Sequence, residues 1–362
     1  MLAIIADDLT GALDSAAPFA ARGCKTVVVL AENGLTEALQ EAPEVLSVDL
    51  SCREATAQEA RRRAAATLAA LPAGTTLFLK IDSRLKGHIA ELLEVFSFHA
   101  ALAAPAIPEF GRIVRDGHVA GFGVDTPIEV AAKLGALVER CTIPDTVTTS
   151  DMLEAARQAQ ARGVDLFIGA RGLAEALAQI ETSTVHPVMA QIPAGPAVFA
   201  IGSRDPITLA QIDMLKQHAA LDLRPAPNGA VSDRAPVRGP LTLVQATEGV
   251  EVNSPEAVAK ALADGIVPAL TETAATLLLC GGATAEAVLD RMKITHFRLV
   301  GECLPGLGLA QLGTQWLIAK SGGFGEPDTL RRVADAVLAN SAGGATPSGK
   351  PGIRITAIGK TK

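Results

Sequence analysis

Two adjacent carboxylates, Asp7 and Asp8, directly follow an apolar run at residues 2–6. Neighbouring carboxylates repel each other, so they need a cation, a proton or a hydroxyl group close by. Such a pair could hold a metal ion or accept a proton from a substrate hydroxyl. The alternative is that Asp8 only caps the helix expected from residue 10, which leaves the second carboxylate unexplained.

A second polar loop, residues 80–88, begins in the apolar run at 76–81. It carries cations, a carboxylate and a hydroxyl: Lys80, Asp82, Ser83, Arg84 and Lys86. A small polyhydroxy carboxylate needs an arginine that forks onto its carboxylate and polar groups for its hydroxyls. The loop therefore favours an anionic sugar-like ligand, with a solvated charged turn as the alternative. Arg112, in a Pro- and Gly-rich stretch, is a further candidate for the carboxylate.

The second half of the chain has three glycine-rich loops, each after an apolar run. Backbone N–H groups of such loops, together with helix N-termini, can bind phosphate. The candidate phosphate ligands are Ser203, Gly281, Gly282, Ala283, Thr284, Ala285, Gly322 and Gly323. None of the loops has the GxxxxGK[ST] or GxGxxG pattern, so a P-loop NTPase or an NAD-binding domain is not supported.

These loops need strands and helices to position them, and apolar runs alternate with Ala-rich helical patterns along the chain. We expect strands at 2–6, 26–30, 45–49, 76–81, 164–168, 197–201, 275–280, 296–300 and 315–319. We expect helices at 10–22, 55–71, 87–98, 150–162, 172–181, 207–218, 255–265, 284–292 and 327–339. The stretch 103–128 reads as loop or hairpin, and 224–240 as an exposed excursion. The pattern predicts an α/β fold with mostly parallel sheets, whose ligands bind beyond the carboxyl ends of the strands.

A chain of 362 residues predicts two domains. A Pro-rich connection at 182–196 separates an α/β domain over 1–190 from a second one over 196–345. Residues 346–362 are Gly-rich and basic, which predicts a flexible tail with one short strand at 353–357.

Composition excludes several classes of function. A net charge of −7 and an aromatic content of 3% argue against a nucleic-acid partner. The five cysteines lack metal-ligand spacing, and no apolar run approaches the roughly 18 residues that cross a membrane. The N-terminus has no secretory pattern, so we expect a cytoplasmic protein.

The motifs together resemble one family. ADDLTGALD, KIDSRLKG, PEFGR with DGH, the GS loop, GGAT with a later PG, and KSGGFG occur in this order. Over about residues 1–340 the chain is similar to the four-carbon acid sugar kinases. The resemblance implies an enzyme that uses ATP to phosphorylate a sugar acid such as threonate, erythronate or 3-oxo-tetronate, in the catabolism of carbohydrate acids. It also implies a sugar-acid-binding first domain, a nucleotide-binding second domain and an active-site cleft between them.

Carried over position by position, the resemblance assigns sugar-acid contacts to Asp7, Asp8, Lys80, Asp82, Ser83, Arg84, Lys86 and Arg112. It assigns ATP contacts to Ser203, Gly282, Ala283, Thr284, Ala285 and Gly322. This chain departs from the family where Ala283 replaces the usual Glu, and where PGLG at 305–308 replaces PGVP.

Phosphoryl transfer needs positioning and charge neutralisation. We expect Mg²⁺ to bridge the phosphates of ATP and Asp8 or Asp7 to act as base or orienter. We expect Arg84 and Lys86 to bind the carboxylate or the transferring phosphoryl group. The partners are then a sugar acid and ATP, and a homo-oligomer is compatible with the sequence. Two alternatives stay open: a Mg²⁺-dependent phosphohydrolase of sugar phosphates, although ADDLT does not match DxDxT, and a non-catalytic sugar-acid-binding protein.

Overall fold

Strands and helices alternate along most of the computed structural model, which describes residues 1–30, 32–182, 186–218, 221–237 and 239–342. The strands are β1 (Leu2–Ala6), β2 (Thr26–Val29), β3 (Val45–Asp49), β4 (Thr76–Lys80), β5 (Ala101–Ala104), β6 (Arg112–Arg115), β7 (His118–Gly121), β8 (Val124–Glu129), β9 (Cys141–Thr142), β10 (Leu166–Gly169), β11 (Ala197–Ile201), β12 (Asp222–Pro227), β13 (Leu241–Thr247), β14 (Thr276–Cys280), β15 (His296–Leu304), β16 (Leu307–Leu312) and β17 (Gln315–Lys320). The α-helices are α1 (Leu9–Ala20), α2 (Leu35–Gln40), α3 (Ala57–Ala70), α4 (Ile89–Leu93), α5 (Val130–Leu134), α6 (Thr149–Ala161), α7 (Arg171–Glu181), α8 (Pro206–His218), α9 (Pro255–Ile266), α10 (Gly282–Arg291) and α11 (Thr329–Ala342). Short 3₁₀ turns lie at η1 (Glu32–Gly34), η2 (Pro108–Phe110) and η3 (Gly135–Arg140).

Within the described ranges, one sheet of fourteen strands runs through both halves of the chain, in the order β12-β13-β11-β14-β17-β16-β15-β2-β3-β1-β4-β10-β5-β9. Neighbouring strands are parallel in the block β2-β3-β1-β4-β10-β5-β9 and in the block β12-β13-β11-β14-β17. β15 and β16 are antiparallel to their neighbours and join the two blocks through the β15–β2 pair. The mostly parallel α/β fold predicted from the sequence is confirmed.

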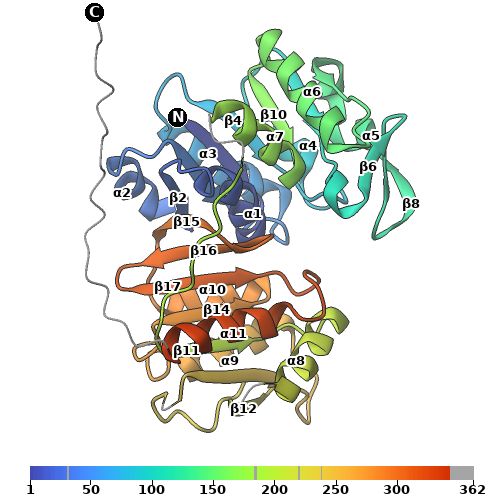
Figure 1. Ribbon diagram of the computed structural model, residues 1–362. Coiled ribbons are helices and arrows are strands. Elements are labelled where there is room, and N and C mark those ends of the chain that lie inside the picture. The colour runs from blue at the N-terminus through green and yellow to red at the C-terminus, as the bar shows by residue number, and fades with distance from the viewer. Residues whose placement is uncertain (31, 183–185, 219–220, 238, 343–362) are drawn as a thin grey trace, which may run out of the picture.

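Burial explains why the strands read as continuous apolar runs. The central strands of both blocks, such as β1 and β14, are covered on both faces, and their side chains from Ala3 to Ala6 and from Leu277 to Cys280 are fully buried. Helices on both faces make the strands uniformly apolar rather than alternating. Helix α1 is itself almost entirely buried, because it packs against β3 of its own half and β15 of the other. Figure 1 shows α1 at the boundary between the two halves.

Several segments differ from the sequence-based expectations, which also lack α2, β5, β13 and β16. The stretch 103–128 is largely a separate three-stranded antiparallel sheet, β6–β7–β8. The helix predicted at 87–98 is only α4, which ends at Leu93 because the chain turns at the next residues. The predicted excursion at 224–240 begins as β12, a strand at the edge of the sheet. Proline has no backbone N–H to donate, and an edge strand tolerates this because it pairs on one side only. The predicted tail at 346–362 and its strand at 353–357 lie outside the described residues.

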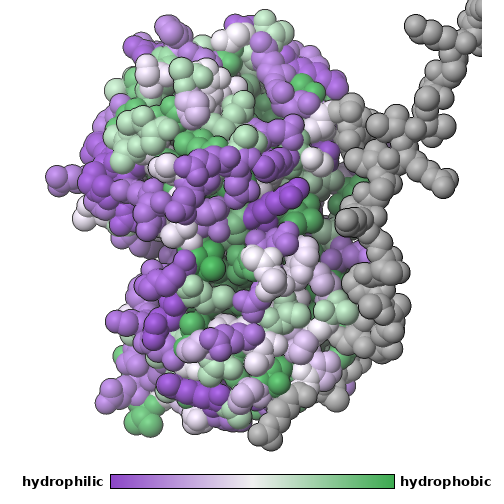
Figure 2. Space-filling model, turned by 90° about the vertical axis from the view of Figure 1, so that its left-hand side faces the viewer, coloured by the Kyte–Doolittle hydropathy of each residue, from purple (hydrophilic) through white to green (hydrophobic). Residues whose placement is uncertain are grey.

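The surface narrows between the two halves. Figure 2 shows an upper and a lower body separated by a waist, at which apolar residues reach the surface. In the described part of the chain, no helix has both the length and the apolar character that crossing a bilayer requires.

Candidate active site

A cavity of about 540 Å³ opens between the two halves of the chain. On the first half it is lined by the strand-end loops after β1 and β4 and by the start of the β6–β8 sheet. The predicted sugar-acid residues among its walls are Asp8, Lys80, Asp82, Ser83, Arg84 and Arg112. On the second half, Asp205, Gly282 and Gly323 line the same cavity. The loops predicted to bind a sugar acid and those predicted to bind phosphate therefore face one shared space.

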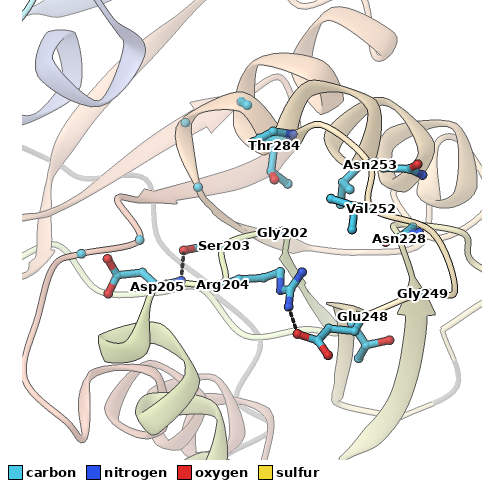
Figure 3. A pocket seen from close by; sticks show the side chains of 18 of the residues that line it. Gly202, Ser203, Arg204, Asp205, Asn228, Glu248, Gly249, Val252, Asn253 and Thr284 are labelled. Carbon is cyan, nitrogen blue, oxygen red and sulfur yellow. Dashed lines mark hydrogen bonds and ion pairs between the residues drawn. The ribbon is translucent and has the colours of Figure 1, made fainter.

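A second cavity of about 620 Å³ lies in the second half, beyond the ends of β11 and β14. Figure 3 shows it with the Ser203 and Thr284 side chains at its wall and Asn228, Glu248 and Asn253 farther along. The predicted phosphate ligands that line it are Ser203, Gly281, Gly282, Ala283, Thr284, Gly322 and Gly323. Ala285 is not among the lining residues, because its side chain is buried in α10.

The two cavities adjoin each other. Asp205, Gly282 and Gly323 line both of them. A ligand that fills the second cavity and extends past these three residues enters the first. The two cavities are therefore arranged so that an elongated anion, such as a nucleoside triphosphate, can place its terminal phosphate among the side chains of the first half.

Asp7 does not line either cavity, because its carboxylate is buried and hydrogen-bonded to Arg53. Both oxygens accept from this guanidinium, at 2.8 Å from Nε and 2.7 Å from Nη2. Burial raises the pKa of the Asp7 carboxyl, and Arg53 acts in the opposite direction. Gly87 leaves room for this pair, because a Cβ there would lie 2.8 Å from the Asp7 carboxylate. The Asp7 carboxylate thus orients the Arg53 guanidinium, and its predicted contact with a sugar acid stays a prediction.

Asp8 lines the cavity and also caps α1, so the cap predicted for this residue is confirmed, while its role as a base or metal ligand stays a prediction. Its Oδ1 accepts from the backbone N–H of Gly11 at 2.7 Å. Its Oδ2 accepts from Thr10 Oγ1 at 2.9 Å and from Arg53 Nη1 at 2.5 Å. These donors fix the orientation of a carboxylate at the wall of the site.

The sequence analysis missed Arg53, which lines the first cavity and contacts both aspartates. A signal was present, since Arg53 follows β3 at the same sheet edge as Asp7 follows β1. The backbone N–H groups of Cys52 and Arg53 donate to the Asp7 carbonyl at 2.9 and 3.1 Å, which ties the two loops together. The strand-end rule that selected Asp7 would have selected Arg53 as well.

Lys80 and Asp14 form a second charged pair at the cavity. Lys80 is buried, and its Nζ donates to the Ile81 carbonyl at 3.0 Å and lies 3.9 Å from Asp14 Oδ1. Burial raises the pKa of the Asp14 carboxyl, and the charge of Lys80 opposes that shift. Asp14, which belongs to the ADDLTGALD motif but was not selected as a site residue, lines the cavity.

Arg84 and Arg112 add two guanidinium groups to the lining of the first cavity. Arg112 donates to Ser83 Oγ at 2.6 Å and to the Phe122 carbonyl at 2.8 Å from Nη2. Burial lowers the pKa of Arg112, and the charge of Arg84 lowers it further. Two cations that repel each other in a cavity favour a bound anion. Lys86 is exposed and is not among the residues that line either cavity.

One aromatic contact connects the two walls. Phe110, in η2 of the first half, meets Phe324 of the second half edge to face, with ring centroids 5.6 Å apart. Both rings line the cavity. Gly306 leaves room for the Phe324 ring, because a Cβ at position 306 would lie 2.2 Å from it. The contact therefore closes one side of the space between the halves.

Comparison with known families gives two matches along the chain. A sugar-binding N-terminal domain model matches residues 2–131, and a nucleotide-binding C-terminal domain model matches residues 230–330. Together they cover more than half of the chain, in the order that the motifs predict.

Curated relatives match over nearly the whole length. A D-threonate kinase of Bordetella bronchiseptica is 26% identical over 93% of this chain and 97% of its own. A 3-oxo-tetronate kinase of Methylobacterium radiotolerans is 26% identical over 92% of this chain and 98% of its own.

Two solved structures share the fold. A Salmonella typhimurium LT2 protein described as a tRNA synthase has a TM-score of 0.71 at 19% identity, covering 92% of this chain and 98% of that one. A Haemophilus influenzae protein has a TM-score of 0.67 at 17% identity, covering 94% of this chain and 100% of that one. With both of its domain models matched in order, the chain belongs to the four-carbon acid sugar kinase family.

Proposed function

We propose that the protein transfers the terminal phosphoryl group of ATP to a hydroxyl of a small sugar acid, of the size of threonate, erythronate or 3-oxo-tetronate. The observation that carries the proposal is the adjoining pair of cavities, which share Asp205, Gly282 and Gly323. One cavity is rich in glycine loops and the other in charged side chains. Relatives named D-threonate kinase and 3-oxo-tetronate kinase, each 26% identical, support this choice of substrate class.

The second cavity would hold ATP with its phosphates over the loops after β11, β14 and β17. Backbone N–H groups at the start of α10 favour negative charge there. Close packing keeps these loops in place, since a Cβ on Gly202 would lie 2.0 Å from Thr284 Oγ1. At Ala283 the methyl group offers no polar contact, so this position would contribute only its backbone.

The first cavity would hold the sugar acid. Arg84 and Arg112 would bind its carboxylate or the transferring phosphoryl group, and Lys80 would neutralise charge between the two substrates. Asp8 would orient the attacking hydroxyl and accept its proton. Asp7 would act on Arg53, whose guanidinium in turn holds Asp8. Such a site works by positioning and electrostatics, which is what phosphoryl transfer requires.

Mg²⁺ fits this site only as a companion of ATP. In the described ranges, no group of three His, Cys, Asp or Glu side chains is placed to hold a metal ion. Mg²⁺ would therefore take its ligands mainly from phosphate and water, with Asp205 as a carboxylate at the junction of the cavities. When bound, the ion neutralises phosphate charge.

The test is a coupled ADP-release assay with ATP, Mg²⁺ and a panel of four- and five-carbon sugar acids. We expect ADP release that depends on one or a few of these acids. Release of phosphate from a sugar phosphate without nucleotide would instead favour a phosphohydrolase. Binding of a sugar acid with no ATP turnover would favour a binding protein.

The aromatic contact across the cleft predicts a smaller effect. Phe110→Ala should lower kcat/KM for the sugar acid about 2- to 10-fold, because an edge-to-face pair contributes about 0.5–1.5 kcal/mol. Steady-state kinetics of Phe110→Ala, Phe324→Ala and the double variant would measure the coupling. If the rings act through each other, the double variant loses little more than either single one. Fully additive losses would contradict the role of the contact.

A further inference from the structure

Lys320, the last residue of β17, is among the most deeply buried side chains of the described residues, with 1% of it exposed. Its Nζ donates to the Ser321 carbonyl at 2.9 Å and lies 3.9 Å from the Cys280 sulfur. In the part of the chain that the structure describes, no carboxylate lies within ion-pair distance of this ammonium. A buried charge without an opposite charge is costly for a folded protein.

Lys80 provides a comparison within the same molecule. It is also the last residue of a strand inside the sheet, is buried, and donates to the carbonyl of the next residue. Lys80, however, has Asp14 at 3.9 Å, whereas Lys320 has no such partner. The two lysines therefore differ in whether a carboxylate of the protein lies within ion-pair distance of the ammonium.

The surroundings of Lys320 indicate where a compensating charge would come from. Its carbonyl accepts from the N–H of Gly281, so its strand supports the loop that opens α10. Thr208, which lies beside Cys280 at 3.7 Å, donates to the Gly322 carbonyl at 2.6 Å. The ammonium thus lies beneath the two glycine loops that line the second cavity. Those loops are the expected position of the phosphates.

We propose that Lys320 is a positioning residue for the nucleotide, whose buried ammonium attracts the phosphates through the glycine loops without lining the cavity. This inference rests on the proposed function, because it requires a polyphosphate in the second cavity. It predicts an uncommon combination: the charge that destabilises the nucleotide-free protein strengthens nucleotide binding.

The test replaces the charge and keeps the volume, with Lys320→Met in the full chain. Differential scanning calorimetry of the nucleotide-free protein should show a melting temperature about 2–4 °C higher, because a buried unpaired charge is removed. Isothermal titration with ADP and Mg²⁺ should show affinity lower on the order of 10-fold, because a charge near the phosphates is lost. Lys216→Met is the matched control, since Lys216 is an exposed lysine of the same half that contacts Gln245, and it should leave ADP affinity unchanged.

A second measurement needs no variant. Burial lowers the pKa of Lys320, so its charge should be lost at a lower pH than that of an exposed lysine. ADP affinity of the wild-type protein should therefore fall as the pH rises toward the range in which an exposed lysine titrates, about 10.4. The other charged or titratable groups that act on Lys320 in the described structure are Asp205 and Cys280, and burial raises the pKa of the Cys280 thiol. In Lys320→Met the affinity should not change over this range.

The outcomes separate the inference from the proposed function. If the wild-type protein binds no nucleotide, the proposed function fails. If it binds ADP and Lys320→Met binds it equally well, the inference is overturned and the proposed function stands. The inference is also overturned if Lys320→Met lowers the melting temperature together with the affinity, because the lysine would then be only structural.

Discussion

Asp8→Asn should lower kcat/KM for the best sugar acid by about 100-fold or more, the range that a general base contributes. The amide cannot accept the hydroxyl proton, and its NH₂ group would face donors where the carboxylate now accepts from Thr10 and Arg53. The fold should survive the change, since Asn is as good a helix N-cap as Asp. Steady-state kinetics with saturating ATP would measure the effect, and calorimetry would verify the fold.

A matched control exists at another helix start. Asp151 lies in the first turn of α6, where its carboxylate accepts from the backbone N–H groups of Val147 and Thr148. It lies outside both cavities, so Asp151→Asn should retain near-native kcat/KM. Near-native turnover by Asp8→Asn itself would show that this carboxylate is not the base.

Arg84→Ala should also lower kcat/KM by about 100-fold, because a charged hydrogen bond to an anion contributes about 1.5–3 kcal/mol. The guanidiniums of Arg84 and Arg112 line one cavity and repel each other as like charges, which together with burial lowers the pKa of Arg112. An anion between them would relieve that repulsion. Removing Arg84 therefore removes both a hydrogen-bond donor and part of the electrostatic attraction for the anion.

The kinetic parameters distinguish the two roles of Arg84. A contact with the substrate carboxylate predicts a higher KM for the sugar acid with kcat nearly retained. A contact with the transferring phosphoryl group predicts that kcat falls instead. Arg115→Ala is the control, because Arg115 is an exposed arginine of β6 that does not line either cavity. Unchanged kinetics in Arg84→Ala would exclude both roles.

Much of the fold could be predicted because each strand carries its own local signal. The apolar runs at 45–49 and 197–201 match β3 and β11 residue for residue. β12 was missed because its prolines read as loop, although an edge strand tolerates them. β16 was missed because Gly308 interrupts its apolar pattern. In both cases the neighbouring strands, rather than the local sequence, determine the conformation.

The residues of the candidate site also divide into those that the local sequence predicts and those that depend on distant parts of the chain. Residues at strand ends, such as Asp8 and Lys80, were found because the position follows from the strand itself. Arg53 was missed because no motif marks it, and its role depends on a partner from another loop. The contact between Phe110 and Phe324 could not be predicted at all, because it joins residues more than two hundred positions apart. The division into domains at 190–196 remains a prediction.

The antiparallel pair of β15 with β2 limits how this molecule can move and melt. Four residue pairs, from His296 with Val29 to Leu299 with Thr26, connect the two halves through main-chain hydrogen bonds. A hinge rotation that separated the halves as rigid bodies would have to break this ladder, so motion during turnover should come from sheet twisting and loop displacement. For the same reason the halves should lose their structure together, in a single cooperative transition on heating, and neither should be stable when produced alone.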